Sequence, residues 1–186
     1  MRRVPPIYRR AIAFALSRML ASEDQKKREI ISRVLLTRLH RPFLAEPSSA
    51  VVADDLETPH TSDATPELSP SEAFAILQTL LTNADPSPTF ITTLLTPIVP
   101  ALYAILMHLE ATKTSDPALK ESVRGFLVTW GRVVGASEGI DTLWTVVLGE
   151  GGEWRVDVAG NLSRVQRCVI PCVYSARSVL TELVQC

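Results

Sequence analysis

The cysteines near the end of the sequence have the spacing that metal binding would require. Cys168 and Cys172 are separated by three residues, which would place both thiols on one side of a helix. Pro171 lies between them, however, and the histidines are far away in sequence. A zinc site needs four ligands, and the other two are missing here. The pattern therefore predicts no metal. The histidines are His40, His60 and His108.

A glycine cluster provides the second chemical motif. Gly149, Gly151 and Gly152 lie close together, as glycines do in loops that hold phosphate groups. The pattern is not GxGxxG, it lacks the Lys-Ser/Thr pair, and strand-like residues follow it instead of a helix. We therefore interpret the cluster as a turn.

No residue pattern indicates catalysis. No nucleophile has a base at the spacing of a known signature, so we expect no enzymatic activity and no cofactor. The three cysteines fit a reducing compartment better than a disulfide framework. No secretory pattern is present at the start.

The composition supports a core but divides the chain by charge. The 186 residues are 46% hydrophobic with a net charge of −1, which argues against nucleic-acid binding by bulk attraction. The chain is basic up to Arg41 and acidic from Glu46 to Glu72. We expect a basic N-terminal helical pair over 1–44 and a disordered acidic linker over 45–69. Helical repeats are predicted over 70–165, and the tail over 166–186 is ambiguous, with a short helix expected from Ser175.

The N-terminal region has two helical patterns. Residues 5–20 combine arginines with apolar residues and contain no acid, so a mitochondrial presequence is an alternative to an ordinary solvated helix. A second helix is predicted over 23–42, starting after Ser22, with a solvated basic face. Its predicted apolar stripe is Ile31, Val34, Leu35 and Leu39.

The most apolar stretch runs from Leu81 to Glu110 and has the punctuation of paired helices. Ser87-Pro88 predicts a helix start, and Pro97 and Pro100 predict a break and a restart. The stretch is long enough to span a membrane. Its threonines, prolines and His108 instead favour a buried core helix, so membrane association is not the leading interpretation.

The helix starts recur at a spacing typical of helical repeats. Ser69-Pro70 and Asp116-Pro117 lie 47 positions apart, and each opens a helix that an inner apolar one follows. HEAT and armadillo units are roughly 40–47 residues long. The predicted fold class is therefore all-α, a fragment of a HEAT- or armadillo-like α-solenoid. A short β-hairpin-like insertion is expected near 150–160.

The same pattern predicts a core and an open edge. One buried cluster is expected to join consecutive helices through Leu102, Ile105, Phe126, Trp130 and Trp144. Because a solenoid unit buries its apolar face only against a neighbour, an uncapped apolar surface is also expected. We place it where the recognisable repeats stop, at Trp144, Val147 and Leu148, as the candidate partner surface.

The segment from Ser69 to Val165 contains the distinctive sequence Asn83-Ala84-Asp85-Pro86-Ser87-Pro88. Over roughly this segment the chain resembles the Transport and Golgi organisation protein six family. Fungal members are described as RNA polymerase II assembly and nuclear-import factors, and members are long α-solenoids. The resemblance implies a non-enzymatic scaffold that binds polymerase subunits, located in the cytoplasm with the nucleus as a second site. It also implies that this chain is a slice of a longer solenoid. The alternative is a mitochondrial or membrane-associated helical protein that uses the basic N-terminus and the apolar 90–109 stretch.

Overall fold

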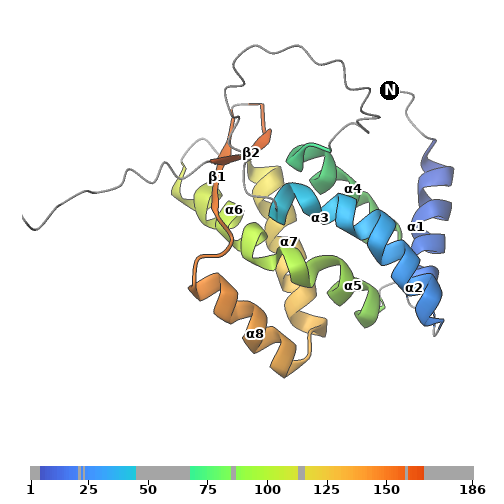
Figure 1. The fold of residues 1–186 in the computed structure, drawn as a ribbon. Coiled ribbons are helices and arrows are strands. Elements are labelled where there is room, and N and C mark those ends of the chain that lie inside the picture. The colour runs from blue at the N-terminus through green and yellow to red at the C-terminus, as the bar shows by residue number, and fades with distance from the viewer. Residues whose placement is uncertain are drawn as a thin grey trace, which may run out of the picture.

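The protein is mostly helical with one small two-stranded antiparallel sheet (Figure 1). The computed structural model describes residues 5–20, 22, 24–44, 68–84, 87–112, 116–157 and 159–165. Most of the predicted acidic linker and all of the 166–186 tail, including Cys168, Cys172 and the helix expected from Ser175, lie outside these residues. The structure confirms the prediction of a mostly helical protein.

The N-terminal region forms α1 (Pro6–Leu20) and a second, longer helical run. That run consists of α2 (Gln25–Ile31), the π-helical segment η1 (Ser32–Leu36) and α3 (Thr37–Leu44). The carboxylate of Asp24 accepts hydrogen bonds from the amides of Lys26 and Lys27, so Asp24 caps the run. The Ser22 hydroxyl instead accepts from the amide of Asp24.

The π-helical segment overturns part of the predicted apolar stripe. Val34 is exposed, whereas Leu36, Leu39 and Phe43 are buried. A π turn contains more residues than an α turn, so the side chains beyond it rotate to a new position around the axis. A pattern counted at 3.6 residues per turn therefore assigned Val34 to the wrong face.

Three helices begin at the predicted proline signals Ser69-Pro70, Ser87-Pro88 and Asp116-Pro117, and at the first and the last a side chain caps the helix start. In α4 (Pro70–Asn83) the Ser69 hydroxyl accepts from the amide of Glu72, and the Glu72 carboxylate accepts from the amide of Ser69, which completes a capping box. In α7 (Pro117–Val133) the Asp116 carboxylate accepts from the amides of Ala118 and Leu119. These bonds satisfy amides that a helix start leaves unpaired.

The centre of the fold is the apolar stretch, arranged as α5 (Pro88–Leu95), the 3₁₀ turn η2 (Thr96–Ile98) and α6 (Val99–Ala111). The break occurs around Pro97, as predicted. By length and composition, Pro88–Ala111 is sufficient to cross a membrane, and half of its apolar section is buried in the fold. Its fully buried side chains include Leu94, Leu95, Ile98, Leu102, Ile105 and Leu109.

The last helix, α8 (Ala136–Val147), packs on α6 and leads into the predicted hairpin of β1 (Glu153–Val156) and β2 (Leu162–Val165). The strands pair from Glu153 opposite Val165 to Val156 opposite Leu162. The glycine cluster forms the turn between α8 and β1. Gly149 and Gly152 have positive φ angles, and a Cβ on Gly151 would collide with the Pro100 carbonyl. These glycines serve the turn and its close approach to α6.

The hairpin forms hydrogen bonds with three helices, α3, α4 and α6. The Arg164 guanidinium donates to the Phe43 carbonyl of α3 at 3.2 Å, and the Leu162 amide donates to the Ser71 hydroxyl of α4 at 2.7 Å. The Val156 amide donates to His108 Nε2 of α6 at 3.4 Å. The ring of Trp154, a buried residue, lies 6.0 Å from that of Phe43.

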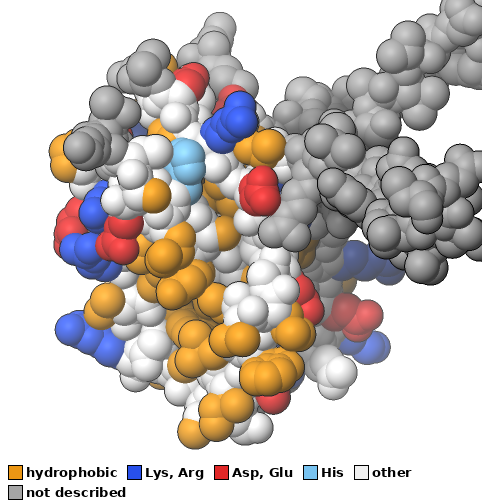
Figure 2. All heavy atoms as spheres, turned by 90° about the vertical axis from the view of Figure 1, so that its left-hand side faces the viewer, with side chains coloured by type: hydrophobic (Ala, Val, Ile, Leu, Met, Phe, Trp, Pro, Cys, Tyr) orange, Lys and Arg blue, Asp and Glu red, His pale blue; other side chains and the backbone are white. Residues whose placement is uncertain are grey.

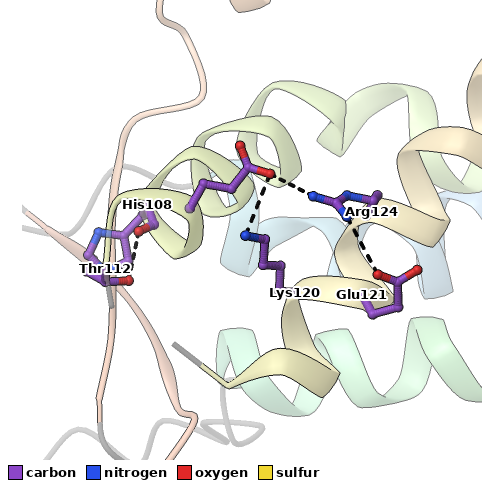
Figure 3. Close-up of polar contacts among 6 residues, drawn as sticks. His108, Thr112, Lys120, Glu121 and Arg124 are labelled. Atoms are coloured by element: carbon purple, nitrogen blue, oxygen red, sulfur yellow. Dashed lines mark hydrogen bonds and ion pairs between the residues drawn. The ribbon is translucent and has the colours of Figure 1, made fainter. Parts of the chain in front are cut away.

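Ion pairs between partly exposed side chains join α6 to α7 (Figure 3). The Glu110 carboxylate lies 2.9 Å from Arg124 Nη2 and 3.9 Å from Lys120 Nζ. All three side chains are partly exposed, so each pair contributes at most about 1 kcal/mol to the free energy of unfolding. Burial of apolar side chains is therefore the larger stabilising contribution of α7. Its buried residues are Val123, Phe126 and Trp130, and the burial of Phe126 and Trp130 was predicted.

Candidate partner-binding surface

Helix α8 turns its small and polar residues toward the protein. Gly139 and Thr142 are buried, and Thr145 and Val146 are half-buried. The Thr142 hydroxyl donates to the carbonyl of Glu138 at 2.8 Å, so its burial leaves no unpaired donor. Small side chains let α8 lie close to α6, but they bury little apolar area.

The large apolar residues of α8 point the other way. Trp144 is 62% exposed and Val147 is 73% exposed. The side chains on this outward face, which we call the α8 face, are those of Ile140, Leu143, Trp144, Val147 and Leu148. Figure 2 shows hydrophobic side chains gathered across the lower half of this side of the molecule. The usual surface helix of a globular protein has the opposite orientation, with its apolar stripe inward.

Trp144 was predicted both as a member of the buried cluster and as part of an exposed apolar surface, and the structure shows that it is exposed. Trp144 does not belong to the core cluster, because α8 contacts α6 through Thr142 and its neighbours. Trp144, Val147 and Leu148 are instead all exposed together. Pattern reasoning missed Ile140 and Leu143, although 100° per residue would have placed both on the side of Val147 and away from Thr142.

The first turn of α8 is fixed by a chain of polar contacts. The Trp130 indole N–H donates to the Thr96 hydroxyl at 3.0 Å, and that hydroxyl donates to the Glu138 carboxylate at 3.0 Å. These bonds connect α7, η2 and α8, so the rotation of α8 about its axis is set by the core. The outward direction of the α8 face is therefore a property of the fold.

Helix α1 repeats the arrangement on another side of the molecule. Its inward positions include Ala13 and Ser17, both buried, and the Ser17 hydroxyl donates to the Phe14 carbonyl at 2.8 Å. Its exposed apolar residues, which we call the α1 face, are Ile7, Tyr8, Ile12, Phe14 and Met19. Helix α1 packs on α2, α4 and α5, whereas α8 packs on α6. Figure 1 shows α1 and α8 on opposite sides of the protein. The predictions made from the arginines of α1 did not include this face.

A hollow of about 680 Å³ lies between α3, the α5–η2 segment and the start of α8. Its lining includes His40, Arg41 and Glu138. The Nε2 atom of His40 lies 2.9 Å from the Leu94 carbonyl. Because a carbonyl only accepts, Nε2 carries the proton and donates. Burial lowers the pKa of His40, and the bond to Leu94 raises it by a smaller amount. His40 is thus held as a neutral structural donor.

No group of three His, Cys, Asp or Glu side chains that could hold a metal occurs among the described residues. His40 and His108 each contact a backbone group, of α5 and of β1 respectively. The feature of the described residues that best suits binding is therefore their exposed apolar surface.

Comparisons of the chain with protein families, with curated proteins and with solved structures give no match.

Proposed function

We propose that this protein is a non-enzymatic helical scaffold that binds other proteins through its open apolar faces, as an RNA polymerase II assembly and nuclear-import factor does. The observation that carries the proposal is the outward orientation of α8. A helix with five large apolar side chains in water is stable only because its other side is anchored. Burying such a side chain gains about 1.5–3 kcal/mol, so a partner that covers the α8 face has a substantial driving force.

Packing within the helical region supports a repeat array. Helices α4 and α7, which start at the two matching proline signals, touch through Phe74 and Phe126, whose ring centroids are 5.0 Å apart. Gln78 also donates to the Ser122 hydroxyl at 3.2 Å. The apolar segment that follows α4 comprises α5, η2 and α6, and its α6 packs against α8, the helix that follows α7. First helix on first helix and second on second is how repeat units stack in a solenoid.

Trp144 is the expected anchor of a partner contact. Tryptophan is enriched among the residues that dominate binding energy because its large ring can be buried almost completely in a pocket. In an array, the occupant of the α8 face would be the next helical unit. In an assembly factor, it would be an apolar helix of a client subunit. The resemblance to the Transport and Golgi organisation protein six family favours polymerase subunits as clients.

Quantitative co-purification tests the scaffold proposal. Tagged wild-type protein should recover polymerase II subunits, and Trp144→Glu should lose most of that recovery. Val34→Glu is the matched control, because Val34 is a similarly exposed apolar residue on η1. Equal recovery by wild type and Trp144→Glu would contradict a role for the α8 face. Recovery of no polymerase subunit would contradict the assembly-factor proposal.

The alternative function is attachment to a membrane or import into mitochondria. The α1 face favours it, because apolar residues beside arginines on one helix suit an anionic lipid surface. Fractionation separates the two proposals. Pelleting that resists both high salt and carbonate would support the membrane alternative and contradict the scaffold.

A further inference from the structure

The two open faces carry opposite charge. Helix α1 contains three arginines and no acidic residue, and Arg10 and Arg18 are exposed. Residues 136–152, which comprise α8 and the turn after it, contain Glu138, Asp141 and Glu150 and no Lys or Arg. All three acids are exposed. Helix α1 therefore presents its large apolar side chains beside arginines, and α8 with the turn after it presents its own beside acids.

The two faces also match in length. At 1.5 Å per residue, α1 with 15 residues is about 22 Å long and α8 with 12 residues is about 18 Å long. One can lie along the other for almost its whole length. Contact between two α8 faces would instead bring acids together, and contact between two α1 faces would bring arginines together. Like charges placed opposite one another disfavour such pairings.

We propose that the α8 face of one copy binds the α1 face of a second copy, head to tail. This inference rests on the proposed function, since it names an occupant for the same surface. The contact joins two different patches, so each copy keeps one face open and further copies can add. Apolar contact supplies the attraction, and the arginines facing the acids set the orientation.

Sedimentation velocity of the full chain with charge-reversed variants tests the proposal. Wild type should associate as its concentration rises. Arg10→Glu/Arg18→Glu makes both ends acidic, and Asp141→Lys/Glu150→Lys makes both ends basic, so each variant alone should stay monomeric. Mixed in equal amounts, the two variants should associate again, because every α1 face then meets an α8 face of opposite charge.

A matched control reverses two charges elsewhere. Arg33→Glu/Arg38→Glu changes the net charge by the same amount on η1 and α3 and should associate like wild type. A wild type that is monomeric up to about 100 µM would overturn head-to-tail pairing, and so would association unaffected by either α1 or α8 reversal. Loss of polymerase recovery by Trp144→Glu in a monomeric wild type would leave the scaffold function standing, so the two proposals fail separately.

Discussion

Thr142 and Trp144 lie two positions apart on α8, yet the threonine is 8% exposed and the tryptophan is 62% exposed. The side of α8 that contacts the protein is thus the side with less to gain from burial. Thr142 closes its own hydrogen bond to the Glu138 carbonyl, while the indole of Trp144 remains in water. This inversion connects the fold to the proposed function, because it leaves binding energy available for another protein.

Substitutions on the two sides of α8 should have opposite consequences. Trp144→Ser should change the free energy of unfolding by no more than about 0.5 kcal/mol, as expected at an exposed position. Thr142→Arg should destabilise the protein by several kcal/mol, because it forces a charge between α8 and α6. Urea denaturation measures both values. A large loss of stability in Trp144→Ser alone would show that the indole is a core residue.

Trp130 should contribute much more to stability through its packing than through its hydrogen bond to Thr96. It is 5% exposed and belongs to the buried core cluster, so Trp130→Ala should cost about 3–5 kcal/mol. Trp130→Phe keeps most of the packing and loses the bond to Thr96, so its cost from that bond is about 1 kcal/mol. Denaturant midpoints of the two variants give the comparison. Similar small costs for both would place Trp130 outside the core.

Two glycines should respond to alanine in opposite directions. Gly151→Ala should cost about 1–3 kcal/mol, because the new methyl group meets the backbone of Pro100. Gly125 lies within α7 with no atom near its missing side chain, so Gly125→Ala should stabilise the protein by about 0.5–1 kcal/mol. Thermal melting of both variants reveals the signs. A neutral Gly151→Ala would mean that the turn does not press against α6.

His40 should make stability depend on pH. Its pKa is lower in the folded state than the ordinary value of about 6.5, so the unfolded state takes up a proton first. The contribution of His40 to the free energy of unfolding is then complete above about pH 6.5, and it is lost as the pH drops through the pKa of the folded state. The carboxyl groups of Asp24, Glu72 and Asp157 also have lowered pKa values and act at lower pH.

The variant His40→Gln isolates this contribution. Its amide can still donate to the Leu94 carbonyl but does not titrate. The decline in melting temperature between pH 7 and pH 5 should be smaller in the variant than in wild type. Identical pH profiles would remove His40 as the cause.

Local signals in the sequence were sufficient for the helix starts at Pro70, Pro88 and Pro117 and for the hairpin, whereas the start predicted after Ser22 lies two residues too early, because Asp24 is the cap. The capping box at Ser69, the Asp116 cap and the break at Pro97 depend on neighbouring residues, and the structure confirms each of them. A hydrogen-bonding carboxylate also explains the hairpin turn, because Asp157 accepts from the amides of Ala159 and Asn161.

The wrong predictions concern which side of a helix faces its neighbours. The place of Val34 depends on a π-helical segment that neighbouring residues do not announce. The place of Trp144 depends on Gly139 and Thr142 being the residues of α8 that are buried against the protein. Large apolar residues were assumed to face inward, and at α8 the close approach that small residues allow decides the orientation instead. The same reasoning applies to α1, where Ala13 and Ser17 face the protein.

Trp144 is the one tryptophan of the chain that is largely exposed to solvent. The chain has three tryptophans, and Trp130 and Trp154 are 5% and 3% exposed. Acrylamide quenching of intrinsic fluorescence in dilute protein measures their accessibility directly. We predict that wild type has a strongly quenched component and that Trp144→Phe loses most of it. Equal quenching of wild type and Trp144→Phe would contradict the outward orientation of α8 and the function proposed from it.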